Sequence, residues 1–121
     1  MTLHRVGFFR ERANGRPDYP EMMRHLNERA QPDEEKIVAY LRAGLIYIAS
    51  PGIVKDVVSN GVEPIGTHSI VTDGTWAWPS DLAYYVDKYH VSLPDDFVQH
   101  LRSRQFRPPK EKEVDITALE L

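Results

Sequence analysis

Histidine is the side chain best suited to proton transfer and metal binding near neutral pH, and the chain contains five. They are His4, His25, His68, His90 and His100. None lies four residues from another, the spacing that places two zinc ligands on one helix face, and none has a carboxylate cluster beside it. The spacing therefore predicts no metal and no cofactor, and a zinc site assembled from distant histidines is the alternative it leaves open.

Other common catalytic patterns are missing from the sequence. The chain has no cysteine, which excludes disulfides, thiolate metal ligands and thiol nucleophiles. It has no phosphate-binding loop, dinucleotide-binding glycine pattern or nucleophile elbow. A small hydrolase or transferase would have to use His68, Asp73 or His90, yet His68 and Asp73 flank one expected strand and would point to opposite faces. We therefore expect a binding protein and no enzyme.

The charge of the chain is unevenly distributed. The formal net charge is −3 and the sequence pI is about 5.9. Residues 30–101 contain ten acidic and four basic side chains, whereas residues 1–29 carry a net charge of +2 and residues 102–121 a net charge of +1. Nucleic-acid-binding domains usually have a pI above about 9, so we expect no nucleic-acid partner. The acidic region suits a protein partner with a basic surface, although acids that only maintain solubility are the simpler explanation.

The length and composition fit one folded domain, since 41% of the 121 residues are hydrophobic. We expect a single α+β domain over residues 1–107 and a C-terminal tail over residues 108–121, which is either loose or a strand ordered by a neighbour. No apolar run approaches the roughly 18–20 residues of a membrane span, and the N-terminal residues lack a signal-peptide core. These features predict a cytoplasmic protein with no membrane partner.

Apolar spacing predicts about four helices packed with a small antiparallel sheet. The first helix is expected over residues 19–30. The second opens at Gln31–Asp33 and ends at Gly44, where a left-handed glycine would stop it. The pattern of apolar residues then changes from helical to strand-like. Residues 45–50 are expected to form a strand, and residues 53–58 either a strand or a helical turn.

The two remaining helices follow the middle of the chain. The third has a good N-cap in Ser80 and ends near His90. The fourth opens at Pro94 and directs Phe97 and Leu101 toward the core.

The clearest local signal is an Asp73–Gly74 pair between two β-prone runs. It predicts a hairpin over about residues 67–78 with a type I′ turn, in which both central residues have positive φ. Trp76 and Trp78 would share one face of this hairpin. There they either fill the core, which we favour, or contact a partner.

Five residues of the last two helices are candidates for binding a partner. Periodicity directs Asp81, Tyr84 and Asp87 outward, and Asp95 with Asp96 begins the final helix. An exposed tyrosine among carboxylates is a suitable contact for a basic protein surface. The two aspartates also suit the positive end of the helix dipole, so they have a structural explanation as well.

One block of the sequence is similar to a known pattern. Residues Thr72–Val86, followed by Tyr89–Phe97, resemble an uncharacterised family of small bacterial proteins with a TDG-W-WP-DL-YYV block. A YLRAG helix end at Tyr40–Gly44, an SPG turn at Ser50–Gly52 and a GFFRE phrase at Gly7–Glu11 also fit this resemblance.

Such proteins resemble the immunity partners of polymorphic or contact-dependent toxins. The resemblance implies a cytoplasmic immunity protein that neutralises a cognate toxin domain by masking its active site. Two other functions stay open. The first is a small-molecule-binding or regulatory module with a pocket beside Trp76 and Trp78, and the second is the small hydrolase or transferase considered above.

Overall fold

Strand β6 (Trp76–Pro79) is buried along its whole length at the centre of the main sheet. The computed structural model describes residues 1–12 and 15–121. In it β6 pairs antiparallel with β5 (Ile70–Thr72) and parallel with β1 (His4–Arg5), and β2 (Leu45–Ile48) pairs antiparallel with β5. The sheet is therefore mixed and not antiparallel throughout as predicted. The long chain between β1 and β6 makes this parallel pairing possible.

A second sheet consists of β3 (Ile53–Lys55) and β4 (Pro64–Thr67), which pair antiparallel. Residues 53–58 thus begin as a strand and continue as a turn. The turn follows from Asp56, whose Oδ1 accepts hydrogen bonds from the backbone N–H groups two and three residues further along, at 2.8 and 3.0 Å.

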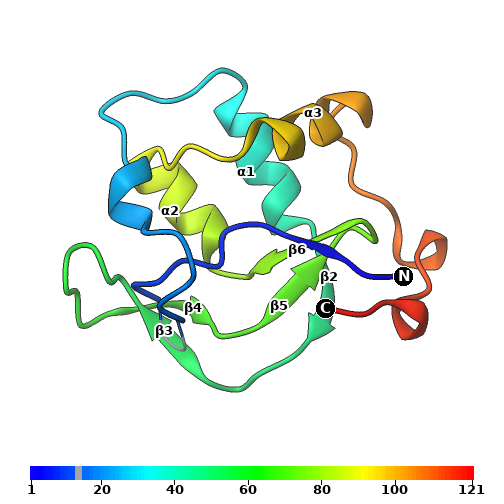
Figure 1. Ribbon diagram of the computed structural model, residues 1–121, viewed down its shortest axis with the longest axis horizontal. Coiled ribbons are helices and arrows are strands. Elements are labelled where there is room, and N and C mark those ends of the chain that lie inside the picture. Colours follow the sequence, from blue (N-terminus) through cyan, green and yellow to red (C-terminus); the bar gives the residue numbers. More distant parts are fainter. Residues whose placement is uncertain (13–14) are drawn as a thin grey trace.

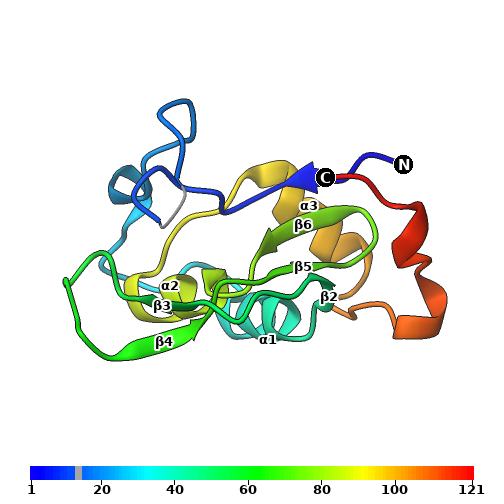
Figure 2. The same cartoon turned by 90° about the horizontal axis from the view of Figure 1, so that it is seen from below.

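Three α-helices occur in the described part of the chain: α1 (Glu34–Arg42), α2 (Leu82–Tyr89) and α3 (Asp95–Ser103). Figure 1 shows them gathered on one side of the strands, and Figure 2 looks onto the opposite side. The α+β class is confirmed, and the expected number of about four helices is one too high. Within the described residues, no helix has the length and apolar character needed to cross a membrane.

The predicted helix over residues 19–30 is wrong, because only a short 3-10 helix, η1 (Met22–His25), forms there. Hydrogen bonds to distant segments take the place of a continuing helix. The carboxylate of Glu11 accepts from the first two backbone N–H groups of η1, at 2.7 and 2.8 Å. Beyond η1 the chain becomes extended, and the N–H of Asn27 donates to the carbonyl of Tyr89 at 3.1 Å.

The two tryptophans lie in the core and share one face, as predicted. Both rings meet Phe97 edge to face, with centroids 5.1 Å apart for Trp76 and 5.8 Å apart for Trp78. Phe97 is 0% exposed. The indole N–H of Trp78 donates to the carbonyl of Leu41 at 3.1 Å, so its polar atom is paired as well. Of the two alternatives for the tryptophans, the structure selects core packing.

The turn between β5 and β6 is not the predicted type I′, because Gly74 has a φ of 94° but Asp73 has no positive φ. The side chain of Asp73 shapes the loop instead. Its Oδ1 accepts from the backbone N–H groups of Thr75 and Trp76 at 2.9 and 2.7 Å. Its Oδ2 accepts from the hydroxyl of Tyr40 at 2.6 Å, which ties the loop to α1.

Two helix ends also differ from the prediction. Gly44 does not take a positive φ; a Cβ at this position would lie 2.8 Å from the ring of Trp78, so the glycine permits close packing. Ser80 is not the N-cap of α2, because Asp81 occupies that position. The hydroxyl of Ser80 instead donates to the carbonyl of Thr67 at 2.6 Å.

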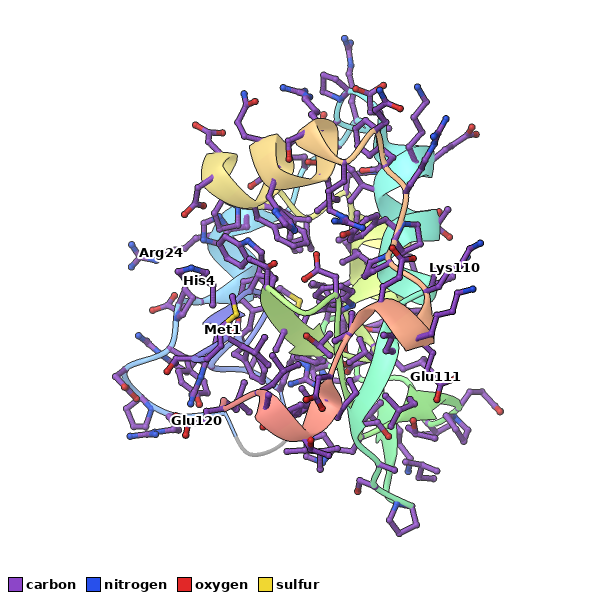
Figure 3. All side chains as sticks on the ribbon, turned by 90° about the vertical axis from the view of Figure 1, so that its right-hand side faces the viewer. Met1, His4, Arg24, Lys110, Glu111 and Glu120 are labelled. Atoms are coloured by element: carbon purple, nitrogen blue, oxygen red, sulfur yellow. The ribbon has the colours of Figure 1, made fainter. Side chains whose placement is uncertain are left out.

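The C-terminal segment, residues 108–121, returns to the beginning of the chain. It contains two 3-10 helices, η2 (Glu111–Glu113) and η3 (Ile116–Ala118). The backbone N–H of Glu120 donates to the carbonyl of Met1 at 2.8 Å. Figure 3 views the molecule from this side and labels both residues.

The position of Phe97 between the tryptophans gives a first prediction. Phe97→Ala should lower the free energy of unfolding by about 3–5 kcal/mol, because the cavity adjoins two large rings that cannot close it. Urea unfolding followed by tryptophan fluorescence measures this loss. Phe106→Ala is a matched control, since that ring is partly exposed at the edge of the core. Equal losses for the two variants would contradict the packing described.

Candidate functional site

Asp81, one of the five residues expected to bind a partner, is not on the surface. Its side chain is 2% exposed and forms a buried ion pair with Arg12. The Nη2 atom of Arg12 donates to Oδ1 at 2.6 Å, and its Nε atom lies 3.0 and 3.2 Å from the two carboxylate oxygens. The predicted outward direction is wrong because Asp81 precedes the first turn of α2, where helical periodicity does not apply. The pair instead joins the N-terminal segment to α2.

The other four candidates remain accessible. On α2, Tyr84 is half-buried and Asp87 is exposed, with its ion-pair partner Arg42 at 3.7 Å. Asp95 and Asp96 are exposed at the start of α3. The structure therefore places two candidates on the outer face of α2 and two on a different helix.

Asp56, to which the sequence did not point, organises the outer face of α2. This residue is 4% exposed, and its Oδ2 accepts hydrogen bonds from the hydroxyls of Tyr84 and Tyr89 at 2.7 and 2.6 Å. The available sequence signal was an aspartate after a β-prone run, which indicates a turn. That signal does not identify tyrosines 28 and 33 residues away.

Tyr85 holds the same loop from the inside. Its hydroxyl accepts from the N–H of Val57 at 3.1 Å and donates to the carbonyl of Lys55 at 3.2 Å. Its side chain is fully buried. We name Tyr84, Tyr85 and Tyr89 the tyrosine clamp, because their hydroxyls together fix the loop after β3 to α2.

Lys88 covers the clamp on its solvent side. Its Nζ donates to the hydroxyl of Tyr84 at 3.0 Å and lies 3.5 Å from Oδ2 of Asp56. The ammonium also lies over the rings of Tyr84 and Tyr89, 5.5 and 5.4 Å from their centroids. These contacts restrict the Tyr84 ring on several sides.

These contacts keep Asp56 ionised and Tyr84 and Tyr85 neutral. Burial alone would raise the pKa of Asp56, but the hydroxyls of Tyr84 and Tyr89 and two backbone N–H groups outweigh it and hold that pKa well below the usual carboxyl range. The hydrogen bond to Asp56 raises the pKa of Tyr84, and burial raises the pKa of Tyr85 to about 12. The hydrogen bond to Tyr84 raises the pKa of Lys88. The network therefore keeps one charge pattern across the physiological pH range.

Of the three residues considered for catalysis, Asp73 and His90 have separate partners, and His68 lies at the surface. Asp73 lies in the core, and its Oδ2 is 2.7 Å from Nε2 of His100. His90 Nδ1 lies 2.8 Å from Oε2 of Glu34. His68 lines a surface hollow. Across residues 1–12 and 15–121, no group of three or more metal-ligating side chains is placed to hold an ion.

Two adjoining hollows flank the N-terminal segment. The larger has a volume of about 520 Å³ and lies between residues 5–9 and residues 92–94. The smaller has a volume of about 340 Å³ and is lined by residues of β2, β5 and β6. The tryptophans beside which a pocket was expected lie in the core and form no part of these walls.

The carboxylates give a prediction in acid. The pKa of Asp56 is lowered as described, and that of Asp73 is lowered because hydrogen bonds outweigh the opposing effect of burial. Both therefore stabilise the fold above the usual carboxyl pKa of about 4, and this stability is lost as pH falls through their folded values. Urea unfolding between pH 7 and pH 2 should show the decline, and Asp56→Asn should make it shallower. An unchanged slope in this variant would contradict the role of Asp56.

The clamp gives a prediction at the opposite end of the pH scale. Tyr85→Phe should lower the free energy of unfolding by about 1–2 kcal/mol, because two partly buried backbone groups lose their partner. A tyrosine unfolded at a pKa of about 10 and folded at about 12 adds stability that is lost as pH rises between these values. The variant should therefore lose less stability over that range than the wild type, measured by urea unfolding. Tyr47→Phe, whose hydroxyl donates to a single carbonyl, is the control.

Comparisons of the chain with protein-family profiles, with curated proteins and with solved structures found no match. The placement of its own residues is therefore the basis for assigning a function. Two features stand out: the rigid, charged outer face of α2 and the paired hollows beside the N-terminal segment.

Proposed function

We propose that the chain is an immunity protein that binds a cognate bacterial toxin domain in the cytoplasm and masks its active site. The observation that carries the proposal is the fixed Tyr84 ring beside the exposed Asp87 on α2. The sequence block that resembles immunity proteins adds independent support. The expected partner presents a basic surface, as toxins that act on anionic substrates do.

The outer face of α2 suits a contact of this kind for a physical reason. Tyrosine supplies a large contact area with few rotatable bonds, and it is enriched among the residues that dominate interface energies. Ordering a free side chain at an interface costs about 0.5–1.5 kcal/mol. Asp56 and Lys88 restrict Tyr84 in the unbound protein, so much of this cost is met before binding.

Exposed carboxylates supply the complementary charge. Asp87 has 63% of its side chain exposed, so its field reaches a partner through solvent. Asp95 and Asp96 extend the acidic character to α3. Charges at the rim of an interface act mainly on the association rate and lose effect as salt rises. Asp81 takes no part in this contact, since Arg12 already neutralises it in the interior.

Coexpression with the product of the adjacent gene tests the proposal. Cells that are inhibited by that product should grow when this chain is present, and the two proteins should elute together on a sizing column. Growth inhibition without rescue, together with separate elution, would refute an immunity function.

A charge reversal then locates the surface. Asp87→Lys should slow association with the toxin about tenfold at low salt, with a smaller effect at high salt. Glu111→Lys is the matched control, because it makes the same charge change on the exposed η2 segment, which Figure 3 shows at the C-terminal end of the molecule. Stopped-flow association kinetics measure both variants. Equal effects would show that the outer face of α2 is not the contact.

A further inference from the structure

The larger hollow beside the N-terminal segment is bounded by three separate parts of the chain. Its lining comes from residues 5–9, from Tyr19, Pro20 and His25 around η1, and from residues 92–94 before α3. Its volume of about 520 Å³ lies within the range of small-molecule sites, roughly 300–1,000 Å³. Walls from three segments make this hollow a concave site for a ligand.

Aromatic rings form much of the lining, and they lie in two pairs. The ring centroids of Phe8 and Tyr19 are 6.3 Å apart, and those of Phe9 and His25 are 6.1 Å apart. Both pairs are tilted. Aromatic rings attract one another through the positive edge of one ring and the negative face of the other. A further aromatic ring in the hollow can make the same contacts, which an aliphatic group of equal area cannot.

The hollow offers no free permanent charge to a ligand. None of the described lining residues is an aspartate or a glutamate, and Arg5 is the one lysine or arginine among them. Its Nη2 atom donates to the main-chain oxygen of Leu121 at 3.0 Å, and its guanidinium lies over the ring of Phe8, 6.0 Å from the centroid. A charged ligand would lose hydration here without an unpaired opposite charge to replace it. The lining therefore favours a neutral ligand.

The polar side chains of the lining have weak partners. The hydroxyl of Ser92 lies 3.5 Å from Nδ1 of His25 and 3.4 Å from the carbonyl oxygen of the same residue, both at the long limit of a hydrogen bond. Within the described residues, Nε2 of His25 has no hydrogen-bond partner. A ligand hydroxyl both donates and accepts, so it can bond to this nitrogen in either tautomer of the ring.

The size of the hollow indicates a ligand with more than one ring. An apolar cavity of about 150 Å³ holds one benzene molecule, so a volume of about 520 Å³ has room for two fused rings. A single aromatic side chain from a partner protein would fill only part of it. The volume therefore favours a free small molecule over an inserted side chain.

We propose that the larger hollow binds a neutral aromatic alcohol with two fused rings, which pack on the two aromatic pairs while the hydroxyl bonds to the imidazole of His25. This site goes beyond the proposed toxin-binding function, because it uses the N-terminal segment and not the outer face of α2. The described lining residues include no member of the tyrosine clamp. Failure of one proposal is therefore distinguishable from failure of the other.

Titration of the full chain with 2-naphthol at pH 7, where this alcohol is neutral, tests the site. It should shift the backbone amide NMR signals of Val6, Ser92 and Leu93, and leave that of Ile53, an exposed apolar residue outside the hollow. Decahydro-2-naphthol should bind about tenfold more weakly, because its saturated rings lose the aromatic contacts. The anion 2-naphthoate should also bind about tenfold more weakly, because its charge finds no partner.

Matched variants assign the contacts. His25→Phe keeps a ring and removes its nitrogens, so it should weaken 2-naphthol binding about fivefold, the loss of one neutral hydrogen bond. His4→Phe, at an exposed position outside the hollow, is its control. Phe8→Leu should weaken binding about fivefold through the loss of one aromatic contact, and Phe106→Leu, also outside the hollow, should leave it unchanged.

Circular dichroism verifies that each variant is folded, and the comparison of ligands uses the unaltered chain, so it decides even where a variant does not fold. Four results would overturn the proposal: no shift in the hollow with 2-naphthol, an equal shift at Ile53, equal binding of either analogue, or unchanged binding in both His25→Phe and Phe8→Leu. Tighter binding of N-acetyltryptophanamide than of 2-naphthol would also overturn it, and would identify the hollow as a socket for an aromatic side chain of a partner protein.

Discussion

The buried ion pair between Arg12 and Asp81 joins the N-terminal segment, which lines the two hollows, to the start of α2, which carries the tyrosine clamp. Removing one partner of such a pair typically costs about 3–5 kcal/mol, because the other charge is left without compensation in the interior. The backbone beside it has little freedom as well: Gly7 has a φ of 79°, and a Cβ there would lie 2.6 Å from a methyl carbon of Leu82. The N-terminal segment is thus held against the start of α2 at two points, through Arg12 on the N-cap Asp81 and through Gly7 on Leu82. Residues of this segment line both hollows.

The features predictable from sequence are those determined by neighbouring residues. Helix α3 was located because Pro94 precedes it and its buried residues recur with helical spacing. The predicted helix over residues 19–30 had similar spacing but did not form, because Glu11 and the chain after α2 supplied competing hydrogen bonds. Periodicity describes which residues share a face if a helix exists. It contains no information on partners that approach from elsewhere in the chain.

The candidate site was less accessible to prediction for the same reason. Tyr84 and Asp87 were identified because their exposure follows from their position on one helix. Asp56 was missed, since its significance comes from hydroxyls about thirty residues away, and Asp81 was misplaced because its partner Arg12 is 69 residues distant. A buried charge needs a partner of opposite charge or a hydrogen-bond donor, and that partner is often distant in the sequence. A pattern read from a short stretch of sequence cannot identify such a partner.

Most residues of the Thr72–Val86 block have a structural role. Trp76 and Trp78 pack on Phe97, Asp73 shapes the loop after β5, and Tyr85 supports the loop after β3. These positions specify the fold. Tyr84 is the outward residue within this block, and the exposed Asp87 follows the block directly on α2.

The parallel pairing of β1 with β6 has a consequence for synthesis. Residues 3–6 are translated well before their hydrogen-bond partners, Thr75, Ala77 and Glu120. At roughly 5–20 residues per second, the wait is on the order of five to twenty seconds. During it the apolar side chains of Phe8 and Phe9 have no finished surface to cover them. Residues 3–6 are thus translated before the segments on which they are placed, and in this interval exposed apolar side chains favour aggregation.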